Sequence, residues 1–170
     1  MKVLSSSPKK GFKVLDLHRE RANRKEFESM LKKFSPSFVV LNGHSSHNTV
    51  CGHKNQPLLI ANKNERLLKS KIVYAISCSS AKTLGPKSIE AGAISYTGYD
   101  DDFIFAFSRI FVSSILKGNS VRDSYKKAKE ILKNNILKLL SSESQDTALV
   151  RFLWWDMKHF VTHGNEEGKL

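Results

Sequence analysis

The segment FVVLNGHSSHNTVCGH, residues 38–53, is decisive for the fold because it joins an apolar run to a loop of reactive side chains. Residues 38–42 are almost continuously apolar, which is the pattern of a strand buried on both faces of a sheet. A second segment of this kind is KIVYAISCSSAKTLG, residues 71–85. Buried strands that end in small polar residues predict a mostly parallel sheet with loops gathered at one edge.

Helical periodicity lies between and after these strands. Residues 22–34 place four apolar side chains on one helical face, and residues 121–139 repeat apolar residues at intervals of three or four. Shorter patterns predict strands at 12–17, 58–61 and 93–99, helical segments at 64–70, 86–91 and 103–116, and a terminal strand at 160–163. This alternation predicts an α/β fold, with a mostly parallel sheet flanked by helices on both faces.

The length of 170 residues fits one domain with a substantial core, and the hydrophobic content of 40% is well above disordered levels. Residues 1–11 lack periodicity and are expected to be a flexible tail, followed by a single domain over 12–165 and a short tail over 166–170. No secretory signal pattern opens the chain, and the only cysteines, Cys51 and Cys78, have no disulfide-framework spacing. A cytoplasmic protein with reduced thiols is expected.

The net charge of +12 is concentrated in residues 1–71, which hold 15 of the 28 Lys and Arg but only 5 of the 16 Asp and Glu. No zinc-finger spacing or basic segment interleaved with aromatics accompanies this charge, so we expect a solvated Lys-rich surface and no specific nucleic-acid binding. The most apolar segment, residues 103–116, is too short to span a bilayer and contains Arg109. No membrane span is expected.

A histidine and a cysteine follow the two buried strands. His44 comes directly after the first strand and Cys78 after the second, 34 residues later. Because functional groups gather past the carboxyl ends of parallel strands, we expect the two to meet. An imidazole beside a thiol favours the thiolate, which is the nucleophile of cysteine hydrolases. The neighbouring small residues leave room for a peptide and expose backbone N–H groups that can hold an oxyanion.

The order Gly-His after one apolar strand and Ser-Cys-Ser after the next resembles the caspase-like cysteine peptidases. This superfamily includes caspases, metacaspases, gingipains, separases and bacterial CHAT domains, and the likeness is to its prokaryotic members. The matching segments are VVLNGH, IVYAISCSSAKTLG, EAGAISYTGYDDDF and KGNSVRDSYKKAKEIL, and the resemblance covers about residues 12–165. It implies a three-layer caspase-like fold and hydrolysis of a peptide or protein substrate without a metal or organic cofactor.

The resemblance also implies roles for individual residues. Cys78 would be the nucleophile and His44 the general base and acid, with the backbone N–H groups of Cys78 and Ser45 forming the oxyanion hole. Serine at position 45 is a departure, because the family usually has glycine directly after the histidine. Cleavage in the family follows Asp, Arg or Lys, and the run Asp100 to Asp102 would supply a negative pocket for a basic side chain. Asp100, Asp101 and Ser77 are the predicted substrate-binding residues. The acidic run is also typical of a helix start.

Two alternatives remain open at this point. His44, His47, Cys51 and His53 are chemically acceptable ligands for zinc, although their spacing matches no structural zinc pattern. A catalytically degenerate module with the same fold, working through protein interactions, is the other alternative. His47 lies further from its strand than His44 and is the weaker candidate for the base.

Overall fold

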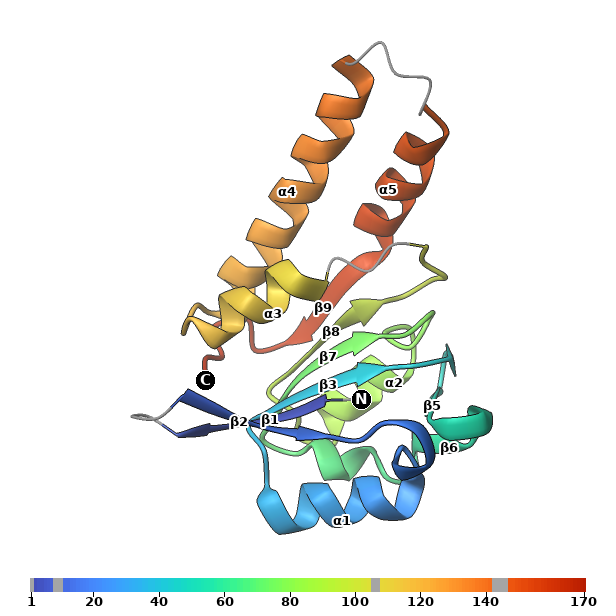
Figure 1. Cartoon of the computed structure of the whole chain (residues 1–170), viewed down its shortest axis with the longest axis vertical. Coiled ribbons are helices and arrows are strands. Elements are labelled where there is room, and N and C mark those ends of the chain that lie inside the picture. The colour runs from blue at the N-terminus through green and yellow to red at the C-terminus, as the bar shows by residue number, and fades with distance from the viewer. Residues whose placement is uncertain (1, 8–10, 105–107, 142–146) are drawn as a thin grey trace.

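The computed structural model describes residues 2–7, 11–104, 108–141 and 147–170 (Figure 1). A six-stranded sheet with the order β2-β1-β3-β7-β8-β9 forms its centre. The strands are β1 (Lys2–Ser7), β2 (Gly11–Asp16), β3 (Phe38–Asn42), β7 (Ile72–Ile76), β8 (Ser95–Tyr99) and β9 (Phe160–Gly164). Strands β3, β7 and β8 are parallel neighbours, whereas β1 is antiparallel to β2 and β3, and β9 is antiparallel to β8. Because β2 also runs in the direction of β3, the described sheet is mostly parallel, as predicted.

Alternate residues of the central strands enter two separate cores. Val39, Leu41 and Val73 face a core closed by helices α1 (Arg24–Phe34) and α2 (Leu84–Glu90). The other face of the same strands carries a second core, to which helices α3 (Ser108–Leu116) and α4 (Val121–Ser141) contribute. Figure 1 shows these helices on opposite sides of the sheet. The predicted α/β class, with helices on both faces, is confirmed.

Helix α5 (Thr147–His159) runs back alongside α4 and leads directly into β9. Leu132 and Ile136 of α4 pack against Leu153 of α5, so the two helices share a small core of their own. In Figure 1 this pair extends away from the sheet. None of the described helices combines the length and the apolar character that a bilayer crossing requires.

The polar loop after β3 folds into a second, antiparallel sheet with the order β4-β5-β6. Its strands are β4 (Ser45–Ser46), β5 (Thr49–Cys51) and β6 (Pro57–Ile60), and 3₁₀ turns occur at η1 (Arg19–Arg21), η2 (His53–Asn55) and η3 (Glu65–Leu68). Leu58 and Leu59 of β6 are buried in the core that contains α1. The strand predicted at 58–61 is therefore present within one residue of its expected position.

The N-terminal segment differs from the prediction of a flexible tail, and the C-terminal tail makes backbone contacts with the rest of the chain. Residues 2–7 form β1, which pairs with β3 from Lys2↔Val40 to Leu4↔Phe38 and so covers an edge whose backbone groups would otherwise lack partners. At the other end, the N–H of Val121 donates to the carbonyl of Gly168, and the N–H of Arg122 donates to that of Glu166. Residues 1 and 8–10 of the predicted tail lie outside the described residues.

Candidate active site at the ends of β3 and β7

His44 and Cys78 occupy equivalent positions beyond two neighbouring parallel strands. Asn42 of β3 and Ile76 of β7 form the last pair of the strand register, and each reactive residue comes two positions later. Both line one open hollow of about 510 Å³. The residues around it are Asn42, Gly43, His44, Ser45, Ile76, Cys78, Asp102 and Phe103. In the structure, the Cys78 thiol and the His44 imidazole therefore belong to residues that line the same hollow.

The backbone around His44 is fixed by the small sheet. The His44 carbonyl accepts a hydrogen bond of 2.8 Å from the N–H of Cys51. At Gly43 an added Cβ would lie only 2.6 Å from the Cys51 carbonyl oxygen, so the residue before the histidine has no room for a side chain. The imidazole of His44 is exposed and makes no hydrogen bond to any described residue. Its ring nitrogens are therefore not engaged by any described residue.

The turn that carries Cys78 is held on both sides. The Ser45 hydroxyl donates a hydrogen bond to the Cys78 carbonyl. Ser79 has a left-handed φ of 55°, and its N–H donates to the carbonyl of Asp101 at 3.0 Å. Within the described chain, no acceptor meets the N–H of Cys78 itself. The nucleophile candidate is half-buried, and its own N–H is free to bind an oxyanion.

Of the three consecutive aspartates, Asp102 is the one that lines the hollow. The Asp100 carboxylate lies 2.7 Å from Nδ1 of His159, and the Asp101 carboxylate accepts the N–H of Asp102. Neither Asp100 nor Asp101 of the predicted pair therefore lines this hollow, whereas the next residue, Asp102, does. Ser77, the other predicted substrate-binding residue, is only 1% exposed and lines neither the Cys78 hollow nor the hollow beside it.

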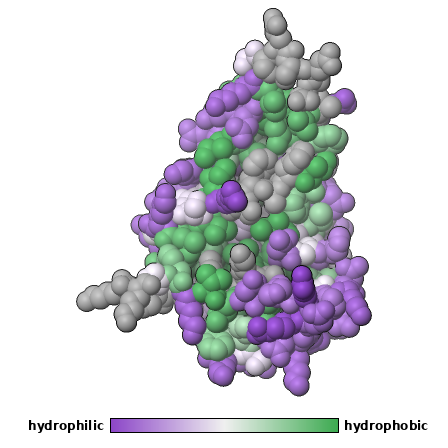
Figure 2. Space-filling model, in the orientation of Figure 1, coloured by the Kyte–Doolittle hydropathy of each residue, from purple (hydrophilic) through white to green (hydrophobic). Residues whose placement is uncertain are grey.

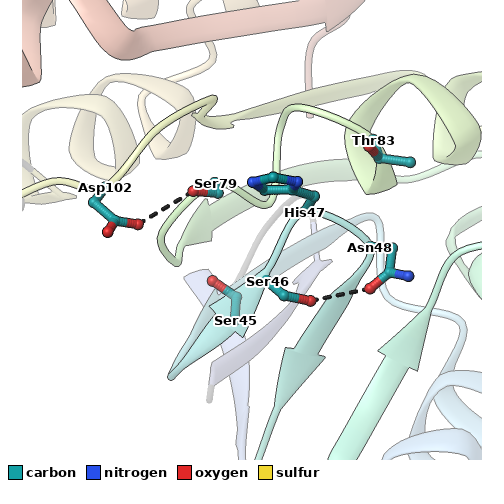
Figure 3. Close-up of a pocket in the computed structure, with 7 residues that line it drawn as sticks. All are labelled: Ser45, Ser46, His47, Asn48, Ser79, Thr83 and Asp102. Carbon is teal, nitrogen blue, oxygen red and sulfur yellow. Dashed lines mark hydrogen bonds between the residues drawn. The ribbon is translucent and has the colours of Figure 1, made fainter.

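A second hollow of about 490 Å³ adjoins the first (Figure 3). Its lining residues are Ser45, Ser46, His47, Asn48, Ser79, Thr83 and Asp102. Figure 3 shows the imidazole of His47 between Ser79 and Thr83, and the Ser79 hydroxyl donating to the Asp102 carboxylate at 3.2 Å. The His47 carbonyl accepts the N–H of Leu84 at 2.9 Å, which fixes its loop to the start of α2. His47 therefore belongs to the neighbouring hollow, while Ser45 and Asp102 are shared.

The alternative zinc site has no cluster to support it. No three His, Cys, Asp or Glu side chains of the described ranges are placed so that they could hold a metal ion. Cys51 lies on β5, where burial raises the pKa of its thiol, and His53 lies in η2. The four proposed ligands, although close in sequence, are thus distributed over different elements of the small sheet and its loops.

The first hollow combines a thiol, an imidazole, a free backbone N–H and a carboxylate on its rim. Nucleophilic acyl transfer uses these groups: the thiol attacks, the imidazole moves the proton and the N–H holds the developing oxyanion. No protein family and no curated protein matches this chain.

Proposed function

We propose that the protein is a caspase-like cysteine endopeptidase that hydrolyses peptide bonds through Cys78 and His44. The observation that carries this proposal is the shared hollow, in which the two residues stand at equivalent positions beyond adjacent parallel strands. The order of the main sheet, with the histidine strand next to the cysteine strand and helices on both faces, supports the caspase-like fold.

The proposed reaction has two stages. The Cys78 sulfur attacks the peptide carbonyl carbon while His44 accepts the thiol proton, and the N–H groups of Cys78 and Ser45 hold the oxyanion. The C–N bond then breaks, and His44 gives its proton to the leaving amine. Water attacks the resulting thioester with His44 as base, releasing the acid and restoring the thiol. The volume of about 510 Å³ is in the range of small-ligand sites and accepts a short peptide segment.

Asp102 is the proposed contact for a basic side chain of the substrate. Its carboxylate accepts a hydrogen bond from the neutral Ser79 hydroxyl, and no described Lys, Arg or His forms an ion pair with it. A carboxylate that is exposed at the rim of a hollow and lacks a cationic partner is complementary to arginine or lysine. We therefore place the preferred cleavage next to a basic residue.

The proposal is tested by cleavage of a peptide library that contains one arginine or lysine in each peptide. Wild type is expected to cleave, and Cys78→Ala and His44→Ala are expected to lose cleavage. Cys51→Ala and His47→Ala are matched controls, because each removes the same kind of side chain from the same region and should leave most of the activity. A peptidyl chloromethyl ketone with arginine next to its reactive group should alkylate Cys78, as mapped by mass spectrometry.

Two results would contradict the proposal. One is cleavage that persists in purified Cys78→Ala. The other is a wild-type protein that does not cleave the library and whose Cys78 is alkylated by the chloromethyl ketone no faster than its Cys51. That is the behaviour of a catalytically inactive module.

A further inference from the structure

A third hollow, of about 320 Å³, lies beyond Asp102 and is lined by Asp102, Ile104, Arg151, Phe152 and Trp155. Its interior is almost entirely apolar. Ile104 is 54% exposed, Phe152 43% and Trp155 39%, which are high values for side chains of this size. Figure 2 shows hydrophobic surface over the helical half of the molecule, in the upper part of the view. Bulky apolar groups exposed around one hollow are typical of a binding site.

Hydrogen bonds fix the two walls of this hollow to each other. The indole N–H of Trp155 donates to the carbonyl oxygen of Asp102 at 2.9 Å. The N–H of Ile104 donates to the carboxylate of Asp156, a fully buried residue of α5, at 3.0 Å. The Trp155 ring also packs on His159 with 4.2 Å between ring centroids. Two hydrogen bonds therefore join helix α5 to the segment after β8, and they fix the walls of the hollow between them.

The apolar hollow adjoins the candidate active site. Asp102 lines all three hollows, so the apolar one shares a wall residue with the hollow of Cys78. Phe103, the next residue, lines the Cys78 hollow and stacks on Tyr99 at 4.1 Å. In an extended peptide, successive side chains point to opposite faces, and side chains two residues apart share a face about 6.6 Å apart. A peptide that places a basic side chain at Asp102 therefore directs the side chain two residues away towards the same surface, on which Ile104 and Phe152 line the apolar hollow.

We infer that this hollow is a substrate subsite for a bulky apolar side chain, such as phenylalanine or leucine, close to the basic residue bound by Asp102. The inference rests on the proposed peptidase function and makes its substrate class more specific: peptides in which a basic and a large apolar residue lie near the scissile bond. Binding of such a side chain removes the apolar surfaces of Phe152 and Ile104 from water, which contributes favourable free energy to binding.

The test uses acetylated octapeptides with one central arginine, in which each flanking position is alanine, lysine, leucine or phenylalanine. At one flanking position, leucine or phenylalanine is expected to raise kcat/KM about tenfold or more over alanine. Phe152→Ala and Ile104→Ala, on different elements, should each reduce that preference. Trp154→Ala is the matched control, because Trp154 is a 50% exposed aromatic residue of the same helix that does not line the hollow.

A binding measurement separates the failure of this inference from the failure of the proposed function. Cys78→Ala protein is titrated with the same octapeptides and followed by tryptophan fluorescence. Tighter binding of leucine and phenylalanine peptides, lost with Phe152→Ala, supports the subsite even where wild type cleaves nothing. Cleavage by wild type without any apolar preference overturns the subsite and leaves the peptidase intact. A dimer that Phe152→Ala dissociates, seen by sedimentation, also overturns it, because the hollow is then covered by a second copy.

Discussion

The Ser45 hydroxyl donates a hydrogen bond to the carbonyl oxygen of Cys78 and thereby connects the loop after β3 with the loop after β7. A glycine, which the resembled peptidases usually have after the histidine, could not make this contact. The serine at this position is thus a structural element of the candidate site. It holds the turn of the nucleophile candidate and also lines both the Cys78 hollow and the adjoining His47 hollow.

Ser45→Ala is expected to lower the free energy of unfolding by about 1 kcal/mol, the usual loss for one removed hydrogen bond. It should also lower kcat, because the turn of Cys78 loses its contact with the histidine loop. Ser45→Thr, which keeps the hydroxyl, should retain most of both. Urea unfolding and peptide cleavage measure the two effects. Ser46→Ala is the control, since the Ser46 hydroxyl, among the described residues, bonds to Asn48 of its own loop and not to the turn of Cys78. Equal behaviour of Ser45→Ala and Ser46→Ala would contradict the prediction.

The two cysteines provide an internal comparison of thiol reactivity. Burial raises the pKa of the Cys51 thiol, so only a small fraction of this thiol is ionised to thiolate at neutral pH. Cys78 lies at the open hollow with His44, and we expect iodoacetamide to alkylate it faster than Cys51 at pH 7. Mass spectrometry of tryptic peptides over a time course measures both rates. His44→Ala should slow the alkylation of Cys78 and leave Cys51 unchanged, whereas faster alkylation of Cys51 would argue against the site.

The strands that precede His44 and Cys78 could be predicted because the sequence pattern that indicates them is local. A continuously apolar run specifies a strand buried on both faces, and the small residues behind each run mark the end of the strand. The acidic residue that lines the hollow could not be singled out in this way. Which of the three consecutive aspartates faces the hollow depends on His159, which binds Asp100 from a distance of 59 residues along the chain. No local pattern contains that contact.

Strand β1 was missed for a similar reason. Residues 2–7 show no alternation of apolar and polar residues that would mark a strand, and their position is specified by backbone pairing with β3. The apolar hollow was also beyond local patterns, because its walls come from the segment after β8 and from α5. Residues 147–159 are compatible with helix or strand in isolation, and their packing on α4 decides in favour of the helix.

Glu28 on α1 is expected to make stability depend on acid pH. A hydrogen bond from Arg24 is the largest cause that lowers the pKa of Glu28 below 4.5, with further contributions from Asn64 and the charge of Lys32, while partial burial opposes them. A carboxyl group whose pKa is lowered by folding stabilises the protein above its unfolded pKa, and this stabilisation is lost as the pH falls through the folded pKa.

Glu28→Gln should therefore reduce the free energy of unfolding at pH 7 by about 0.5 kcal/mol, a typical value for ion pairs on a helix surface. The difference from wild type should disappear as the pH falls below 4.5. Urea unfolding measured from pH 7 to pH 3 checks this, because urea leaves the ionic strength unchanged. Glu130→Gln, at an exposed position on α4, is the control for loss of one surface carboxylate and should leave the free energy of unfolding at pH 7 nearly unchanged. A difference between Glu28→Gln and wild type that persists at pH 3 would contradict the assignment.

Asp102 is expected to determine the charge preference of cleavage. Asp102→Asn keeps the acceptor for the Ser79 hydroxyl but removes the negative charge, so it should reduce the preference for arginine over glutamine at the cleavage position about fivefold, as for one exposed ion pair. Asp101→Asn is the matched control, because the Asp101 side chain lines none of the described hollows.

Salt gives an independent check on the role of Asp102. The protein has a net charge of +12, which repels a basic peptide at long range, whereas the contact with Asp102 is short-range and attractive. At about 0.15 M ionic strength, charges more than about 8 Å apart are largely screened. In both proteins, moderate salt screens the long-range repulsion and so speeds the association of arginine peptides. In wild type it also weakens the attraction to Asp102, so the increase in association rate should be larger for Asp102→Asn than for wild type. Identical salt dependence in the two proteins would show that the carboxylate does not contact the substrate.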